Sequence, residues 1–566
     1  MNGAMTIINF LKKKGVNPAF GYPGGSVIVL YDAIYQTQFP HVLTRHEQGA
    51  VHAAEGYAKV TGRPGVVFAT SGPGATNLVT GIADAYLDSV PLLAITGAVA
   101  RDSIGKDAFQ EADITGITQP ITKYNYLVMT PEDLIPTLEE AWQLTTEGRP
   151  GPVLVNVPKD LFTTEIPVDQ SSGEGVIIHR PKRKEAVDMV SQVFDALKNA
   201  KQPLLLIGGG VVISDGACEA LSEFMSKSGM LVATTMMGKG AIDENHPKYL
   251  GMVGMHGTPQ ANVAIGKCDL LLAVGCRFSD RIIGNPSKYN AYEGRTVIHV
   301  DIDPAEIGKN IRPHIEIEDD ACSFFSHMNL KFPEDSLEGL WTEWNERISE
   351  KRIRYQGIKD RLHELDDRLL PEAVVYAISQ AYVGEKPILV TDVGQQQIFA
   401  AQHFQVESPR SFLTSGGLGT MGTGLPYAVG AAIAAPERPV VLFVGDGGLQ
   451  MTIQEFGPLK SMNLNVKVII MDNQQLGMVR QWQELFFEKR YSQTLLENNP
   501  NFIQIADAYG LKGGRATNKD ELIEQIKIMH DTDGPYVLHV MLDIKELVYP
   551  MIPAGKNPED MMMPGM

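Results

Sequence analysis

The chain has 566 residues, 44% of them hydrophobic and 20% charged, a composition typical of a globular protein with about three or four domains. The net charge of −18 argues against the nucleic-acid phosphate backbone as a partner, and no run of 18 apolar residues is available to span a membrane. The N-terminus lacks a signal-peptide pattern and the four cysteines are sparse, without metal-type spacing, so we expect a cytoplasmic protein.

The first third of the chain alternates short apolar runs with helix-length segments, which predicts a parallel sheet covered by helices. The expected strands are His41–Thr44, Gly65–Thr70, Pro91–Thr96 and Pro152–Val157. The turn Ser71–Gly74 follows the second strand and leads into a helix. Such a turn can bind an anion or merely reverse the chain.

Glu47 lies just after the first of these strands, at the expected N-terminus of a helix. Small residues recur at helical spacing from Ala50 to Tyr57 and define that helix. A carboxylate here can simply complement the helix dipole. A buried carboxyl can also exchange a proton with a bound group, so the residue is a candidate for acid–base chemistry.

The middle of the chain predicts a second α/β domain after a polar linker at about 169–183. Its expected strands are Pro203–Ile207, Leu231–Thr234, Asp269–Val274 and Thr296–Val300. A glycine run follows the first strand and an aspartate ends the last, which suits a nucleotide, although the full dinucleotide fingerprint is missing. A charged stretch with two tryptophans, 334–370, then predicts a solvated helical connector.

A third α/β pattern runs from Pro387 to about Leu542. Thr414-Ser415-Gly416 repeats the earlier Thr70-Ser71-Gly72, and each is followed by a small-residue helix and a strand that begins with proline. This correspondence hints at an internal duplication.

Two apolar runs of this third pattern end in oxygen-bearing residues, Asp446 after Val440–Gly445 and Asn473 after Val468–Asp472. Because parallel strands end at one edge of a sheet, we expect both side chains there. A carboxylate and an amide carbonyl form a partial shell for Mg²⁺, which completes its octahedron with phosphate and water. The glycines around Asp446 allow backbone N–H groups to approach a diphosphate.

This pair of motifs resembles the diphosphate and metal motif of thiamine-diphosphate enzymes. The resemblance implies that Mg²⁺ is held by Asp446, Asn473 and the backbone carbonyl of Gln475. It implies that Glu47 is the catalytic residue that hydrogen-bonds the aminopyrimidine. The remaining coenzyme contacts carried over from the family are Gln395, Gln396, Gly419, Met421, Gly447, Gly448 and Met478.

Across nearly the whole chain, 3–555, the sequence resembles acetohydroxyacid synthases, the acetolactate-forming enzymes of valine, leucine and isoleucine synthesis. Their central domain binds FAD, and the matching residues are Arg149, Gly208, Gly209, Gly210, Thr235, Met255, His256, Arg277, Asp301 and Asp320. The substrate residues implied in the same way are Gly25, Phe109, Gln110, Lys159, Arg281 and Trp482.

The resemblance implies three doubly wound parallel-sheet domains. They are a pyrimidine-binding domain at 1–168, an FAD-binding domain at 185–330 and a diphosphate-binding domain at 371–545, with a connector at 331–370 and a tail at 546–566 over the active site. It implies decarboxylation of pyruvate and transfer of the two-carbon unit to pyruvate or 2-ketobutyrate, with a structural FAD. The family assembles as homodimers or homotetramers with sites between subunits, and a separate small regulatory subunit would carry any feedback control.

The chain departs from the family pattern at a few positions. Asp472 replaces the first of two asparagines, Gln396 replaces a histidine, and Ser279 replaces an aspartate two residues before Arg281. Ser26 and the Gly97–Ala100 segment also differ, and both line the expected substrate channel. Substrate preference and inhibitor sensitivity are therefore left undetermined by the sequence.

The nearest alternative is a pyruvate oxidase, which would use the same cofactors with a redox-active FAD. Phe109, Gln110, Arg281 and the Gln481-Trp482 pair favour the synthase. Three more distant protein classes fit less well. A flavin-free acetolactate synthase would lack the segment from Arg277 to Arg281, a glyoxylate carboligase would lack Glu47, and a non-catalytic nucleotide sensor would give the metal motif no purpose.

A helical stripe in the last third also has two interpretations. Met478, Trp482 and Leu485 share one helix face, which is the usual pattern of a core-facing stripe. The resemblance instead assigns the tryptophan to the pocket of the second substrate.

Overall fold

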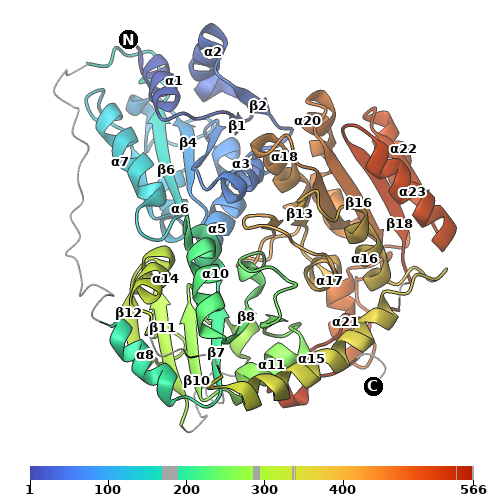
Figure 1. The fold of residues 1–566 in the computed structure, drawn as a ribbon. Coiled ribbons are helices and arrows are strands. Elements are labelled where there is room, and N and C mark those ends of the chain that lie inside the picture. Colours follow the sequence, from blue (N-terminus) through green and yellow to red (C-terminus); the bar gives the residue numbers. More distant parts are fainter. Residues whose placement is uncertain (168–188, 285–293, 334–336, 338, 544, 564–566) are drawn as a thin grey trace.

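The computed structural model describes residues 1–167, 189–284, 294–333, 337, 339–543 and 545–563, and the predicted linker at 169–183 lies outside them. Its described strands form three six-stranded sheets, and every pairing between them is parallel. The prediction of three parallel α/β domains is therefore confirmed (Figure 1). Within the described ranges, none of the helices has the length and apolarity that crossing a membrane requires.

The first sheet has the strand order β2-β1-β3-β4-β6-β5. Its strands are β1 (Ala19–Gly21), β2 (His41–Leu43), β3 (Gly65–Ala69), β4 (Leu92–Ala98), β5 (Tyr124–Leu127) and β6 (Pro152–Pro158). Its helices are α1 (Gly3–Lys13), α2 (Ile28–Thr37), α3 (Glu47–Thr61), α4 (Pro73–Thr76), α5 (Val79–Asp88), α6 (Ile114–Thr118) and α7 (Leu134–Thr146). Apolar residues of α1, α2 and α7 cover one face, and those of α3 and α5 cover the other.

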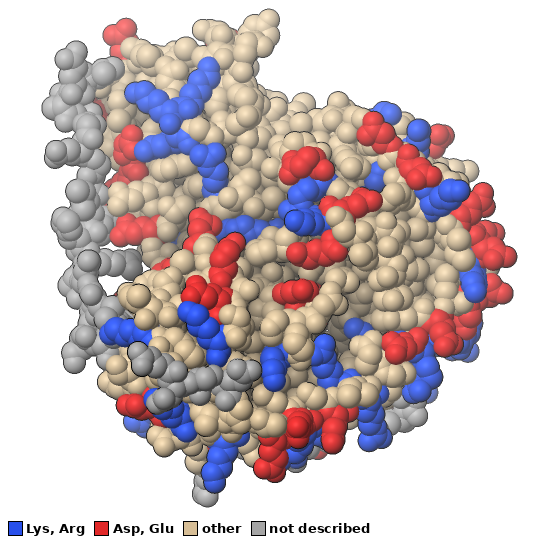
Figure 2. All heavy atoms as spheres, in the orientation of Figure 1, with Lys and Arg blue, Asp and Glu red and all other residues tan. Residues whose placement is uncertain are grey.

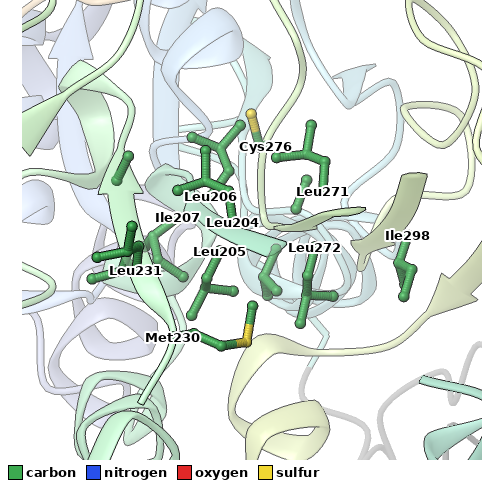
Figure 3. Packing of buried hydrophobic residues seen from close by; sticks show 14 of the residues in the cluster. Leu204, Leu205, Leu206, Ile207, Met230, Leu231, Leu271, Leu272, Cys276 and Ile298 are labelled. Atoms are coloured by element: carbon green, nitrogen blue, oxygen red, sulfur yellow. The ribbon is translucent and has the colours of Figure 1, made fainter. Parts of the chain in front are cut away.

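The second sheet has the order β12-β11-β10-β7-β8-β9, which is the order of dinucleotide-binding folds. Its strands are β7 (Pro203–Ile207), β8 (Leu231–Thr234), β9 (Tyr249–Met252), β10 (Leu270–Val274), β11 (Thr296–Asp301) and β12 (Ile315–Glu318). Its helices are α8 (Val190–Asn199), α9 (Gly209–Ile213), α10 (Ala217–Ser228), α11 (Pro259–Lys267), α12 (Asp280–Ile283) and α14 (Ala321–Leu330). Figure 3 shows the leucine-rich β7 and β10 packed side by side in the core of this domain.

The third sheet has the order β14-β13-β15-β16-β18-β17, which repeats the connectivity of the first. Its strands are β13 (Ile388–Thr391), β14 (Phe412–Leu413), β15 (Val440–Gly445), β16 (Val466–Asp472), β17 (Lys512–Ala516) and β18 (Tyr536–Met541). Its helices are α16 (Pro371–Ala381), α17 (Gln395–His403), α18 (Gly424–Ala434), α19 (Asp446–Thr452), α20 (Phe456–Ser461), α21 (Gly477–Phe486), α22 (Phe502–Ala508) and α23 (Lys519–Asp531). This shared topology agrees with the duplication suggested by the sequence.

Helices α3 and α18, each following the second strand of its own domain, cross at close range and join the first and third domains (Figure 1). Glycines make this approach possible. A Cβ on Gly56 would lie 2.3 Å from the carbonyl oxygen of Tyr427, and a Cβ on Gly430 would lie 1.9 Å from that of Ala53. The two helix backbones are therefore in direct contact at the crossing.

The connector contains the long helix α15 (Thr342–Leu362), in which Trp344, Ile348 and Tyr355 are buried and the other residues are not, so the helix is largely solvated as predicted. Trp341 and Trp344 are buried in the core of the second domain, where their indole N–H groups donate to the carbonyls of Ala200 and Pro203 at 3.0 and 3.1 Å. Figure 2 shows acidic and basic side chains mixed along the edge where Figure 1 places α15. One side of the helix is thus solvated and the other is a domain contact.

Candidate functional site

A cavity lies at the carboxyl edge of the third sheet, between the ends of β15 and β16. These strands are neighbours, with Gly445 opposite Met471 at their ends. The residues around the cavity include nine that the sequence suggested for the coenzyme and the metal: Gln395, Gln396, Met421, Asp446, Gly447, Gly448, Asn473, Gln475 and Met478. The fold brings these residues together from separate stretches of chain.

Asp446 carries the most perturbed carboxyl group of this cavity. Burial and the nearby charge of Asp472 raise its pKa to about 7. Asn499 links the two acids, because its amide donates to Asp446 at 2.6 Å and to Asp472 at 3.2 Å. A cation bound at Asp446 would favour the ionised form of its carboxyl group.

Asp472, which replaces an asparagine of the family pattern, has its own partners. Burial raises its pKa, but hydrogen bonds from His539 and the Gln474 amide outweigh burial and lower it overall. The imidazole Nε2 of His539 lies 2.8 Å from the carboxylate. Asp472 is therefore bound by groups of the protein itself. Because successive side chains along a strand point to opposite faces, the side chains of Asp472 and Asn473 are expected on opposite sides.

Asn473 and Gln475 are oriented by the chain around them. The Asn473 amide N–H donates to Gln395 Oε1 at 3.0 Å, so its carbonyl oxygen is the atom left to face a metal. Gln474 between them has a positive φ of 56°. A non-glycine residue in this conformation is a local strain of the kind found at ligand sites.

Asp392, at the end of β13, holds the loop that carries Met421. It is fully buried and accepts hydrogen bonds from the N–H groups of Gly422 and Gly424 at 2.9 to 3.1 Å. Burial raises its pKa to about 6. Gly419 of the same loop has a φ of 71°, and a Cβ there would meet open space, so glycine is needed for the backbone conformation.

Glu47 is not among the described residues that line this cavity. It begins α3, it is 9% exposed, and its carboxylate accepts a hydrogen bond from Asn77 at 3.0 Å. A Cβ on Gly74 would lie 3.1 Å from its second oxygen, so the Ser71–Gly74 turn passes beside the carboxylate. Within one chain, Glu47 is therefore not part of the wall of the cavity that holds Asp446.

A second cavity lies between the second domain, α21 and the C-terminal tail. Met255, Arg281 and Trp482 line it, together with the tail residues 552–558. The Arg281 guanidinium is 3.5 Å from the sulfur of Met255, and its side chain is 66% exposed. A cationic group beside a half-buried indole can receive a small carboxylate with an apolar chain.

The other suggested substrate residues lie elsewhere, on the first domain. Gly25 and Lys159 are exposed, Phe109 is 89% exposed, and Gln110 has a positive φ of 61°. The structure thus separates the six suggested substrate residues into two groups. The stripe Met478, Trp482 and Leu485 is half-buried. Met478 packs against the core of the third domain, and Met478 and Trp482 also line the cavities described above.

The suggested FAD residues gather around the second sheet. Gly208–Gly210 follow β7 at the switch point of the strand order, where the Gly210 N–H donates to the Gly275 carbonyl after β10 at 3.1 Å. A Cβ on Gly208 would lie 1.9 Å from that carbonyl oxygen. Dinucleotides bind at such a switch point, between the loops that follow the two central strands.

Polar members of this group already have partners in the protein. Arg149 contacts Glu306 at 2.8 Å, and Thr235 and Asp320 cap helical turns with their side chains. His256 Nδ1 lies 3.2 Å from the Pro550 carbonyl, and burial lowers its pKa to about 4. Asp301 ends β11, and burial raises its pKa to about 6. Arg277 follows β10 in the same cluster of loops.

Sequence reasoning missed Asn77 and Asn499 as residues that hold the candidate site, and it named Gln481 only as part of the Gln481-Trp482 pair. Asn77 binds Glu47, Asn499 bridges the two aspartates, and Gln481 is fully buried behind Gln395. Asn77 and Asn499 lie far along the chain from their partners and belong to no motif. The one local feature of the sequence that could have drawn attention to Asn499 is its short polar side chain next to Pro500.

Comparison with known families matches three models along the chain. They are the thiamine pyrophosphate enzyme N-terminal TPP binding domain at residues 1–117, the central domain at 190–328 and the C-terminal TPP binding domain at 392–540. Together with the three sheets, these matches define the class of protein as a thiamine pyrophosphate enzyme.

Sequence identity to individual proteins identifies the family within this class. The chain is 42% identical over 570 residues to "Acetolactate synthase isozyme 2 large subunit" of Escherichia coli K12, covering 99% of both chains. It is 42% identical to "Probable acetolactate synthase large subunit" of Methanocaldococcus jannaschii, covering 100% of this chain and 95% of the relative. It is 41% identical to "Acetolactate synthase 2, chloroplastic" of Nicotiana tabacum, at 100% and 85% coverage. The chain belongs to the acetolactate synthase large-subunit family.

Proposed function

We propose that the chain catalyses thiamine-diphosphate-dependent acetolactate synthesis, the decarboxylation of pyruvate followed by transfer of the two-carbon unit to a second 2-keto acid. The observation that carries this proposal is the shared cavity at the ends of β15 and β16, which collects Asp446, Asn473 and the glycines after β15. The names of the relatives support the same activity.

The residues around this cavity suit a magnesium diphosphate. Asp446 and the Asn473 carbonyl would be metal ligands with the backbone carbonyl of Gln475, and the N–H groups of Gly447 and Gly448 begin α19 beside the cavity. Bound thiamine diphosphate supplies an electron sink that makes decarboxylation of a 2-keto acid accessible. Met421 and Met478 provide apolar walls to the same cavity.

Glu47 would meet the other end of the coenzyme, at the aminopyrimidine ring. Its buried carboxylate is held by Asn77 through one oxygen, which leaves the second oxygen to exchange a proton with the ring. Because Glu47 does not line the cavity within one chain, we propose that a partner subunit supplies it, in a homodimer or a homotetramer. Exposed apolar side chains on the first domain support such a contact: Ile28, Tyr35 and Phe109.

We propose that FAD occupies the switch point of the second sheet in a structural role. The close contact between Gly208–Gly210 and Gly275 and the carboxylate of Asp301 at the end of β11 fit a dinucleotide. Acetolactate formation involves no net redox change, so no electron transfer is required of the flavin. The yellow colour of a purified protein would support this assignment.

Arg281 and Trp482 are our candidates for binding the second 2-keto acid, either pyruvate or 2-ketobutyrate. Both line the second cavity beside the tail. The guanidinium would pair with the carboxylate, and the indole would contact the alkyl group.

We further propose the functional boundaries 1–168, 185–330, 331–370, 371–545 and 546–566. We also propose a cytoplasmic location and association with a small regulatory subunit.

The test is a product assay on the purified chain with pyruvate, Mg²⁺ and thiamine diphosphate. We expect CO₂ release and acetolactate. Formation of acetate or acetyl phosphate with reduction of a flavin would favour a pyruvate oxidase instead. Absence of CO₂ release with wild-type protein that binds the coenzyme would refute the proposed function.

A further inference from the structure

Gln481 lies at the centre of a buried hydrogen-bond chain behind the diphosphate cavity. It sits in α21, and none of its surface is exposed. Its side-chain oxygen accepts hydrogen bonds from Gln395 Nε2 and from the backbone N–H of Val548, both at 2.9 Å. Its side-chain nitrogen donates to the Val548 carbonyl at 3.3 Å and to the sulfur of Met551 at 3.4 Å.

The same chain continues to the metal side of the cavity. Gln395 accepts a hydrogen bond from the Asn473 amide at 3.0 Å while its own amide donates to Gln481. A second, longer hydrogen bond runs from Gln395 to the carbonyl of Glu546 at 3.4 Å. The amide of Asn473 is therefore connected to the C-terminal tail through only two glutamine side chains.

The tail is also fixed on its other side. The N–H of Ile552 donates to the Met255 carbonyl at 2.8 Å, and His256 Nδ1 lies 3.2 Å from the Pro550 carbonyl. Val548 and Met551 are fully buried. Beyond them, residues 552–558 line the second cavity together with Arg281 and Trp482.

We propose that Gln481 is a positioning residue that couples the docking of the tail to the orientation of Gln395 and Asn473. Ordering of the diphosphate–metal site then tightens the tail over the second cavity, and a docked tail in turn favours binding of the diphosphate and its metal, because coupling between two sites is reciprocal. The inference rests on the proposed function, since it takes magnesium thiamine diphosphate as the ligand of the first cavity.

The physical reason is that buried amides have no water to replace a lost partner. Replacement of Gln481 by leucine roughly keeps the size of the side chain, but it removes the acceptor of the Val548 N–H and leaves the Gln395 amide with only its longer hydrogen bond to the Glu546 carbonyl, and each loss carries a desolvation penalty. The carboxylate of a glutamate at this position still accepts from both donors, although it cannot donate to the Val548 carbonyl.

The test measures two quantities in the full chain. One is the hydrogen-exchange rate of the backbone amides at 548–552, with and without Mg²⁺ and thiamine diphosphate. The other is the affinity for thiamine diphosphate at saturating Mg²⁺, from quenching of tryptophan fluorescence. The variants are Gln481→Leu and Gln481→Glu, and the control is Gln525→Leu, which removes one glutamine hydrogen bond, from Tyr536, on the distant α23.

We expect exchange in the tail of the wild-type protein to slow when the coenzyme binds. In Gln481→Leu, tail exchange should be about tenfold faster and coenzyme binding about tenfold weaker, as expected for loss of buried hydrogen bonds. Gln481→Glu should recover most of the tail protection, and Gln525→Leu should leave both quantities unchanged.

The inference is overturned if the wild-type tail exchanges at the same rate with and without coenzyme, or if Gln481→Leu binds the coenzyme as tightly as wild type. Failure of the wild-type protein to bind thiamine diphosphate at all would overturn the proposed function together with the inference. The two failures are thus distinguished by the wild-type binding curve.

Discussion

Replacing Gly430 with alanine tests how the first and third domains are held together. The added Cβ would lie 1.9 Å from the Ala53 carbonyl oxygen and 2.7 Å from the Tyr57 nitrogen, both backbone atoms of α3. Real Cβ atoms do not approach other heavy atoms below about 3 Å, so the helices must separate. No flexible side chain is available at this point to move aside.

Two opposing effects decide how much Gly430→Ala changes the free energy of unfolding. Alanine is favoured over glycine inside a helix by about 1 kcal/mol. Overpacking of a close contact costs about 1–3 kcal/mol, and a clash with backbone places the cost near the upper end. The net expectation is a loss of about 2 kcal/mol in the free energy of unfolding, which lowers the thermal midpoint by about 4–8 °C for a unit of 150–250 residues.

The matched control is Gly357→Ala in the exposed middle of α15, where a Cβ would have no neighbour within 4 Å. Only the helix-propensity term acts there, so its midpoint should rise slightly. Differential scanning calorimetry of both variants measures the difference. If Gly430→Ala is as stable as Gly357→Ala, then backbone contact between α3 and α18 does not hold the domains together, and the reasoning fails.

Three further outcomes are expected. Burial raises the pKa of Glu455 from 4.5 to about 7, so the folded state binds the proton more tightly than the unfolded state does. The contribution of this group to the free energy of unfolding is therefore greatest below pH 4.5. It falls by about 3 kcal/mol as the pH rises to 7. Glu455→Gln should therefore gain stability over wild type with rising pH in thermal unfolding scans, and a pH-independent difference would contradict this. Glu47→Gln, which keeps an acceptor for Asn77, should slow CO₂ release from pyruvate at least about 10²-fold with an unchanged thermal midpoint; retained activity would exclude an acid–base role. Asp446→Ala should weaken Mg²⁺-dependent binding of thiamine diphosphate at least about tenfold in fluorescence titrations, and equal affinity would remove Asp446 from the metal site.

Most central strands could be predicted from sequence with errors of one or two residues, but the central strands β1 and β18 were missed. Strands β7 and β8 have the expected bounds, and β15 and β16 end at the expected motif. These strands are buried on both faces, so their sequences are continuous apolar runs. The loops that follow these strands could also be predicted from sequence, because they carry glycines and oxygen-bearing residues.

Edge strands and short strands were missed, including β5, β9, β12 and β17. The sequence of β17, Lys512–Ala516, contains two glycines and two basic residues, and its residues alternate little in polarity. Such a strand forms because its neighbour β18 offers a free edge of backbone groups. Its own side chains give almost no signal.

The sequence by itself determined the three-domain plan and the chemistry of the strand ends, because local composition and period record burial and turns. Only the tertiary structure showed that Asn499 bridges Asp446 to Asp472, that Gln481 connects Gln395 to the tail, and that Trp341 and Trp344 at the start of the connector helix are buried. These contacts join residues tens to hundreds of positions apart. Hydrogen bonds are short and directional, so whether two distant polar groups meet depends on how the domains pack rather than on either local sequence.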